Sequence, residues 1–285
     1  MKPLLLALTM LLPLAQQPAP PSMAEINISS HGSRMNGLIY LAAGDAPRPV
    51  VIFLHGFPGN EKNLDLAQAV RRAGYQAVYI DYRGNWGSAG TFSFANGLED
   101  VDAVLAWVRS KDNADTYHFD TTRIAIVGHS YGGWLALMTA AHEQPSVCVA
   151  GLAAWNIGWA GARFAPQPGE RDAAIADLGT SMGPGGPINT TAENLVREMS
   201  DHGAAWNYIA QAGTLKNHAV LLVSATNDSL DEGPLQHKQL ADAIQAAGGT
   251  RVTNLVFDDD HPFSAHRLEL ADVLIKWLKT DCASK

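Results

Sequence analysis

The chain reads Ile124-Ala125-Ile126-Val127-Gly128-His129-Ser130-Tyr131-Gly132-Gly133 before a second apolar segment, Trp134 to Met138. The first apolar run predicts a buried strand, and the second predicts a helix. A serine between such elements is typical of a sharp strand-to-helix turn that exposes its hydroxyl at the helix N-terminus. Gly128 and Gly132 allow the neighbouring backbone to approach closely. We therefore predict that Ser130 is a nucleophile.

Short apolar runs alternate with amphipathic segments along most of the chain. Runs without polar alternation suit strands that are covered on both faces. Repeated strand-helix-strand units predict an α/β fold, a mostly parallel twisted sheet with helices on both faces. The expected strands are 26–29, 38–42, 50–54, 77–80, 124–127, 147–153, 220–224 and 252–257.

Residues 155–217 interrupt this alternation, because they are rich in Gly, Pro, Ala and Trp and contain no clear strand. Loops of this length are uncommon in a compact domain unless they have a function. We expect a small helical cap insertion, with helices near 171–178 and 191–199. An insertion that does not contact the site is the alternative.

Residues 1–24 resemble an export signal. Lys2 supplies a positive start, and the apolar segment 4–14 is too short to span a bilayer comfortably. We expect cleavage after Ala15 or after Ala24, and the sequence does not decide between these two sites. Residues 25–285 would then form a soluble α/β domain, periplasmic or secreted, without stable membrane insertion.

The formal net charge of −8 argues against nucleic acid or an anionic membrane as a partner. Cys148 and Cys282 form a disulfide in one interpretation, and Cys148 is a buried free thiol in the other. No set of metal ligands occurs at a recognisable spacing, so we expect neither a metal nor another cofactor.

A serine hydroxyl needs a base, and the base needs a third group that fixes its tautomer. Asp228 follows the expected strand 220–224, and His261 follows the strand that ends at residue 257. Groups that follow parallel strands collect at the carboxyl edge of the sheet. The order Ser130, Asp228, His261 therefore predicts a catalytic triad.

Other acids and bases are weaker candidates. Asp231 is an alternative acid one turn after Asp228. We expect Asp258–Asp260 to be a solvated loop, of which at most one member raises the basicity of the histidine. His237 and His266 are expected inside helices, where they are poorer bases. Packing or surface roles are expected for His118, His129 and His142.

An oxyanion hole needs two backbone N–H groups directed at the oxygen that becomes negative. Tyr131, directly after the nucleophile, is one expected donor. The loop His55-Gly56-Phe57-Pro58-Gly59 follows the expected strand 50–54 and supplies the other. We expect the Phe57 N–H to point inward.

The chain resembles the α/β-hydrolase superfamily over nearly all of its expected mature length. The motif 128–133, Asp81-Tyr82-Arg83-Gly84 and Asp260-His261-Pro262-Phe263 are similar to the catalytic domain of the prolyl oligopeptidase family. Dienelactone hydrolase-like esterases share much of this pattern. The resemblance implies the triad Ser130, Asp228 and His261, with Phe57 and Tyr131 as oxyanion donors, and a structural role for Arg83.

The peptidases of that family carry a large N-terminal propeller, for which 285 residues leave no room. We therefore expect a serine carboxylic ester hydrolase acting on a small-molecule ester through an acyl-enzyme. A small serine peptidase or amidase is the alternative. Acyl transfer to an alcohol and a catalytically silent scaffold are further possibilities, and the complete triad argues against the scaffold.

Aromatic residues of the cap and of one loop are candidates for an apolar acyl or aryl pocket. Packing of the cap against the main domain is the equal alternative. No convergent set of Arg or Lys indicates an anionic substrate. The candidates are Trp86, Trp155, Trp159 and Trp206.

Overall fold

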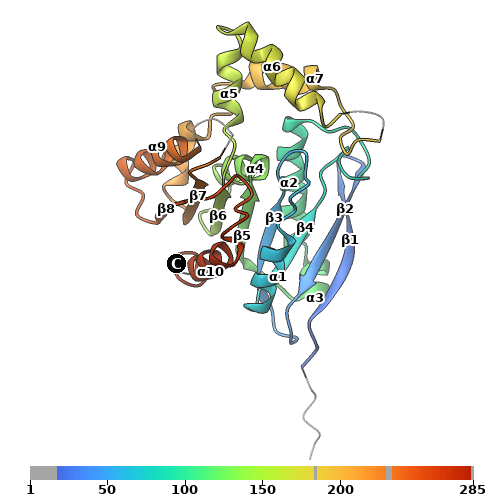
Figure 1. Cartoon of the computed structure of the whole chain (residues 1–285). Coiled ribbons are helices and arrows are strands. Elements are labelled where there is room, and N and C mark those ends of the chain that lie inside the picture. Colours follow the sequence, from blue (N-terminus) through green and yellow to red (C-terminus); the bar gives the residue numbers. More distant parts are fainter. Residues whose placement is uncertain (1–17, 183–184, 229–232, 284–285) are drawn as a thin grey trace, which may run out of the picture.

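The computed structural model describes residues 18–182, 185–228 and 233–283. An eight-stranded sheet, ordered β1-β2-β4-β3-β5-β6-β7-β8, forms its centre (Figure 1). β1 and β2 form an antiparallel hairpin, β2 is antiparallel to β4, and the other neighbours pair in parallel. Every expected strand is present. The bounds are β1 (Ser22–Ser30), β2 (Ser33–Leu41), β3 (Arg48–Leu54), β4 (Gln76–Ile80), β5 (Phe119–His129), β6 (Val147–Leu152), β7 (Val220–Ala225) and β8 (Val252–Phe257).

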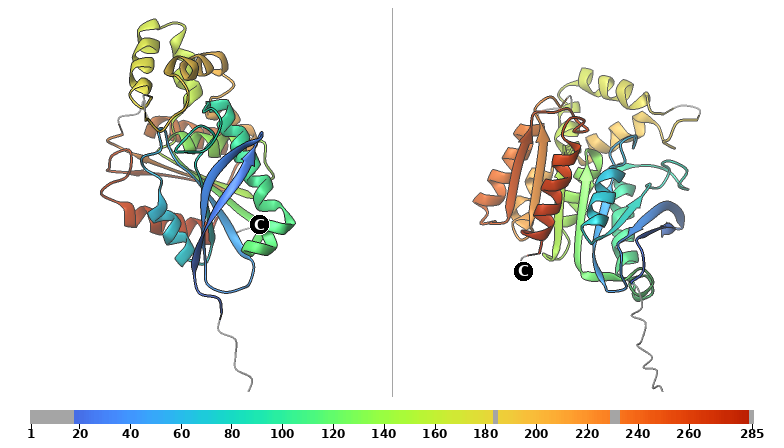
Figure 2. Two further views of the ribbon diagram at one scale, coloured as in Figure 1. Left: turned by 90° about the vertical axis from the view of Figure 1, so that its right-hand side faces the viewer. Right: turned by 60° about the horizontal axis from the view of Figure 1, so that its bottom comes forward.

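Helices cover both faces of the sheet, which confirms the predicted fold class (Figures 1 and 2). Along β3, Val50, Ile52 and Leu54 pack in one core, whereas Val51 and Phe53 pack in the other. This alternation follows from the two-residue period of a strand. The first core contains α2 (Phe94–Arg109), α4 (Tyr131–Ala140) and α9 (Gly233–Ala246), and the second contains α1 (Leu64–Arg72) and α10 (Arg267–Lys279); α3 (Lys111–Tyr117) follows α2.

A helical insertion lies between β6 and β7, and its helices α5, α6 and α7 lie at the upper end of the molecule in Figure 1. The helices expected near 171–178 and 191–199 are α6 and α7. None of the helices in the described part of the chain has both the length and the apolar character needed to cross a membrane. The insertion contains α5 (Ile157–Phe164), α6 (Pro168–Gly179), α7 (Ala192–His202), a 3₁₀ helix η1 (Tyr208–Gln211) and α8 (Ala212–Leu215).

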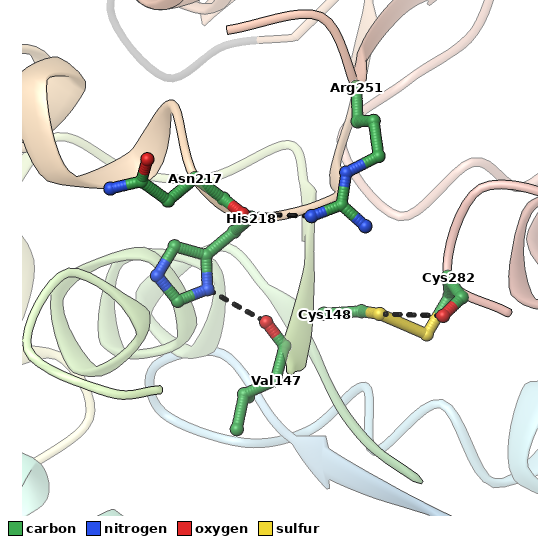
Figure 3. The surroundings of a disulfide bond; sticks show 6 residues. All are labelled: Val147, Cys148, Asn217, His218, Arg251 and Cys282. Carbon is green, nitrogen blue, oxygen red and sulfur yellow. Dashed lines mark hydrogen bonds between the residues drawn. A yellow bond between two sulfur atoms is a disulfide. The ribbon is translucent and has the colours of Figure 1, made fainter. Parts of the chain in front are cut away.

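A disulfide joins Cys148 on β6 to Cys282, which follows α10 (Figure 3). The two Cα atoms are 5.6 Å apart, within the usual range for a disulfide. The structure thus selects the bonded interpretation that the sequence left open. Beside the bond, His218 Nδ1 donates a hydrogen bond to the Val147 carbonyl (2.8 Å). The bond attaches the C-terminal segment to an interior strand.

Candidate active site

Ser130 occupies the turn between β5 and α4, with φ 56° and ψ −118°. Residues other than glycine rarely adopt a positive φ, so the turn is strained in the way that a nucleophile turn requires. A Cβ on Gly128 would lie 1.9 Å from the Gly132 carbonyl oxygen, and a Cβ on Gly132 would lie 2.1 Å from that of Leu54. Only glycine therefore fits at these two positions of the motif.

Backbone hydrogen bonds fix the position of Ser130. Its N–H donates to the Leu152 carbonyl (2.9 Å), and its carbonyl accepts from Gly133, Trp134 and Trp155 (2.9–3.1 Å). The serine therefore bridges the ends of β5 and β6 at the first turn of α4. The N–H groups of that first turn have no acceptor within the helix and carry the positive end of its dipole.

The predicted acid and base form a direct pair. His261 Nδ1 lies 2.8 Å from Asp228 Oδ2, and the side chains are 21% and 2% exposed, respectively. An ionised carboxylate has no proton to donate, so it accepts this hydrogen bond and Nδ1 carries the proton. The other ring nitrogen, Nε2, is then free to accept a proton from a hydroxyl group.

The loops that carry the acid and the base are hydrogen-bonded to each other. Thr226 N–H donates to the Phe257 carbonyl, and Asn227 N–H donates to the Asp259 carbonyl, both at 2.9 Å. These contacts continue the pairing of β7 and β8 beyond the sheet. The two loops therefore form one unit.

The loop that carries His261 contacts the strand that precedes Ser130. The Nε2 atom of His129, the last residue of β5, lies 2.9 Å from the His261 carbonyl oxygen, and the two imidazole centroids are 4.6 Å apart. The structure thereby brings together the three stretches of chain from which the sequence predicted a triad. His129 is buried, as the predicted packing role implies, but its contact with the base was not predicted.

The loop expected to supply an oxyanion donor lies against the nucleophile. A Cβ on Gly56 would be 3.0 Å from the Cβ of Ser130. Tyr131, the other expected donor, follows Ser130 directly and begins α4. Gly56, the neighbour of Phe57, therefore lies beside the serine, and the assignment of Phe57 and Tyr131 as oxyanion donors stays a prediction.

Trp86 contacts the loop 55–59, the predicted oxyanion loop, from outside. Its Nε1 donates to the Pro58 carbonyl (2.9 Å), next to Phe57. Lys62 Nζ lies 4.7 Å from the centre of the Trp86 ring. Trp86 itself is 38% exposed. The sequence leaves open whether Trp86 lines the substrate pocket or packs the cap against the main domain, and these contacts are those of a residue that supports the loop 55–59.

The loop that carries Trp86 pairs with residues 187–189 of the insertion. Trp86 N–H donates to the Pro187 carbonyl (2.9 Å), and Asn189 N–H donates to that of Gly84 (2.7 Å). Arg83 is buried, and its guanidinium donates to Asp100 (2.5 Å), which confirms the structural role implied for it. The insertion is thus connected to the oxyanion loop through Trp86.

The other tryptophans have different surroundings. Trp206 is 6% exposed and packs on Trp134 (ring centroids 5.1 Å apart) and His202 (4.3 Å), so the packing alternative holds for it. Trp159 lies under the Arg163 guanidinium at 4.1 Å, in the first turn of α5. Neither contact indicates a substrate pocket.

Trp155 lines a cavity of about 300 Å³ between α5, α6 and α7. Its backbone N–H donates to the Ser130 carbonyl, so Trp155 contacts both the cavity and the turn at Ser130. Only Leu178 is buried among the twelve residues of α6. Arg163 and Glu170 form an ion pair on the wall of this cavity. The apolar lining residues include Trp155, Ala160, Phe164, Ala174, Leu178 and Met199.

Asp259 contradicts the expectation of a solvated loop over 258–260, because it is 5% exposed. It accepts hydrogen bonds from Nδ1 and the backbone N–H of His266 and from the Ala265 N–H. Burial opposes ionisation, but these hydrogen bonds lower the pKa of Asp259 to about 2. Its carboxylate therefore orders the base loop. Three consecutive aspartates in the sequence do not reveal which of them points inward.

The remaining candidates have other surroundings or lie outside the described residues. His237 is on α9 as expected, and burial lowers its pKa to about 4. His266 precedes α10 as its N-cap residue, so its expected place inside the helix was wrong. Asp231 lies outside the described residues. Over 18–182, 185–228 and 233–283, no three His, Cys, Asp or Glu side chains are grouped so as to hold a metal ion.

Comparisons with known proteins show what the chain is similar to in sequence and in fold. Residues 38–149 match the model of the BD-FAE family. The quorum-quenching protein AidA of Acinetobacter baumannii is 28% identical over 131 residues, which are 44% of this chain and 41% of that protein. The chain thus spans less than half the length of this relative.

Two solved structures cover most of the chain. Est1E of Butyrivibrio proteoclasticus, solved with ferulic acid bound, has a TM-score of 0.66 at 16% identity, over 91% of this chain and 100% of that one. A Klebsiella pneumoniae protein described as a dienelactone hydrolase has a TM-score of 0.61 at 17% identity, over 91% and 99%. These similarities establish the fold.

Proposed function

We propose that this chain, which has the α/β-hydrolase fold, hydrolyses carboxylic esters through an acyl-enzyme on Ser130. The observation that carries the proposal is the pair of His261 and Asp228, 2.8 Å apart and joined to the strand of the nucleophile through His129. The match to the BD-FAE family and the similarity to Est1E support an ester substrate.

The reaction follows from the arrangement of these groups. Ser130 Oγ attacks the ester carbonyl carbon while His261 Nε2 takes the hydroxyl proton. The carbonyl oxygen becomes negative and accepts hydrogen bonds from the N–H groups of Phe57 and Tyr131. Asp228 stabilises the imidazolium.

Collapse of the tetrahedral intermediate breaks the bond to the alcohol, which leaves with the proton from His261. Water then attacks the acyl-enzyme as His261 takes its proton. A second collapse returns that proton to Ser130 and releases the carboxylic acid.

The cap cavity beside Trp155 suits an apolar, uncharged group of the ester. Arg163 on its wall is already paired with Glu170 (2.5 Å), so no anionic group is needed to balance it. Cavities of roughly 150 Å³ accommodate benzene, and this one measures about 300 Å³. A short to medium acyl chain or a substituted aromatic ring therefore fits.

The direct test is Ser130→Ala, assayed with p-nitrophenyl acetate. We expect kcat to fall on the order of 10⁴- to 10⁶-fold, with an unchanged Tm. Retained activity would remove Ser130 from the mechanism.

A series of p-nitrophenyl esters of increasing acyl length, compared with aminoacyl amides, tests which type of bond is cleaved. Efficient cleavage of amides alone would overturn the proposal.

We further propose that the protein is exported after cleavage behind Ala15. The proposed signal falls largely outside the described residues. Ala24 pairs with Ile39 inside β1 and β2, so cleavage after Ala24 would remove paired strand residues. The disulfide of Cys148 and Cys282 suits an oxidising compartment. Mass spectrometry of the mature protein should give an N-terminus at Gln16. An N-terminus at Glu25, or an uncleaved chain, would contradict this.

A further inference from the structure

His129 directly precedes the nucleophile and is 4% exposed. Its Nε2 lies 2.9 Å from the His261 carbonyl oxygen. A carbonyl can only accept a hydrogen bond, so Nε2 carries the hydrogen. Burial, together with the adjacent His261, lowers the pKa of His129 to about 3. The ring is therefore neutral, and Nδ1 bears no hydrogen.

The opposite side of the ring faces the oxyanion loop. A Cβ on Gly56 would lie 3.3 Å from His129 Nδ1 and 3.0 Å from Ser130 Cβ. Within the described part of the chain, Nδ1 has no hydrogen-bond partner. The nucleophile turn, the base loop and the oxyanion loop thus all meet at this imidazole.

We propose that His129 is a positioning residue that sets the His261 imidazole for proton transfer with Ser130. This inference rests on the proposed esterase function. Asp228 attaches the His261 ring to the loop after β7, whereas His129 attaches the backbone of the same residue to the strand that carries the nucleophile. A misplacement of about 1 Å at a reacting group lowers a rate by roughly 10²-fold.

The neutrality of His129 is part of this role. Its ring centroid lies 4.6 Å from that of His261, which becomes an imidazolium during each step of the reaction. A second positive charge at this distance would oppose proton transfer. A suitable replacement therefore needs a hydrogen-bond donor without charge.

The experiment compares His129→Gln with His129→Met, which have side chains of similar length and differ in the terminal donor. We expect kcat of the Gln variant to stay within about threefold of wild type, in line with one retained hydrogen bond. The Met variant should lose roughly 10- to 100-fold in kcat with little change in KM. His142→Met, at an exposed histidine, is the control and should match wild type.

A second substrate separates positioning from a general loss of structure. An alkyl ester needs a proton from His261 for its leaving alkoxide, whereas p-nitrophenolate leaves without one. The Met variant should therefore lose more activity on ethyl acetate than on p-nitrophenyl acetate. Equal losses on both esters would contradict the proposal, as would a folded Met variant with wild-type kcat or a Gln variant as impaired as the Met variant.

Two further measurements keep the test decisive. If His129→Met does not fold, His129→Asn replaces it, because its amide is one carbon too short to reach the His261 carbonyl. An Asn variant as active as the Gln variant would overturn the proposal.

If the wild type hydrolyses no ester, the proposed function fails. The rate at which a fluorophosphonate labels Ser130 then still tests the positioning, and equal rates for Gln and Met would refute it.

Discussion

His261 and Asp228 are 33 residues apart in the chain, yet Nδ1 of one lies 2.8 Å from Oδ2 of the other. The Asp228 side chain is 2% exposed, so water does not replace this contact. A buried carboxylate needs such a partner, because desolvation makes an unpaired charge unfavourable. The pair therefore fixes both the tautomer and the direction of the imidazole.

Asp228→Asn should lower kcat by roughly 10³- to 10⁴-fold, because an amide favours the wrong tautomer of His261 without removing a reacting group. Steady-state kinetics with p-nitrophenyl acetate measure the loss. Asp258→Asn is the matched control, since Asp258 accepts from Thr226 Oγ1 at an exposed position, and it should stay near wild type. A loss for Asp258→Asn as large as for Asp228→Asn would argue against the assigned acid.

Trp86→Phe should lower kcat about tenfold with little change in KM, because one support of the oxyanion loop is lost. The donor removed is Nε1, which binds the Pro58 carbonyl at 2.9 Å. Trp159→Phe, whose ring lies under Arg163, serves as the control. If Trp86 instead lines the substrate pocket, which is one of the two interpretations that the sequence leaves open, KM should rise while kcat stays unchanged.

Replacing Cys148 and Cys282 together by serine should reduce the free energy of unfolding by about 3–5 kcal/mol, because the bond closes a long loop in the unfolded chain. The separation of the two residues is 134 positions. Cys148 lies near the amino end of β6, away from the carboxyl edge that carries the site, so kcat at 25 °C should not change. Urea unfolding with and without a reductant measures the effect. Identical curves would show that the bond contributes nothing.

Stability should rise with pH between about 4 and 6.5. Burial lowers the pKa of His55 to about 4, that of His129 to about 3 and that of His237 to about 4. The unfolded chain therefore binds protons in this range that the folded chain does not, and stability is lost as the pH falls below 6.5. Each of these histidines lowers the free energy of unfolding by about 2 kcal/mol when the pH falls from 7 to 5.

Urea midpoints at pH 7 and pH 5 check this dependence. His237→Gln should reduce the difference between the two, whereas His142→Gln, at an exposed position, should leave it unchanged. A stability that stays constant from pH 7 to pH 5 would contradict the burial of neutral histidines.

Local pattern sufficed for much of the fold and for the strand-to-helix turn at Ser130. The residues 124–127 before Ser130 form an unbroken apolar run. A Cβ on Gly128 would lie 1.9 Å from the Gly132 carbonyl oxygen within the same turn, whereas the 2.1 Å approach at Gly132 is to Leu54 on β3. Asp228 and His261 followed from the rule that parallel strands end at one edge. The 2.8 Å pair agrees with that prediction.

Contacts between distant segments could not be predicted in the same way. The hydrogen bond from His129 to the His261 carbonyl joins residues 132 positions apart, and that from Trp86 to Pro58 joins residues 28 apart. Asp259 shows the same limit, since its burial depends on His266 and not on its acidic neighbours. Periodicity reports which face of an element is apolar, whereas the partner of a polar atom depends on tertiary packing.

The pairing of residues 187–189 with the Trp86 loop has a consequence for engineering. A chimera that takes its entire cap from another esterase would replace Pro187, which accepts from Trp86, and Asn189, which donates to Gly84. Selectivity and turnover would then change together. The loss of turnover would wrongly be attributed to a poor substrate pocket in the new cap. A graft confined to residues 157–182 exchanges the cavity walls of α5 and α6 while it preserves that junction.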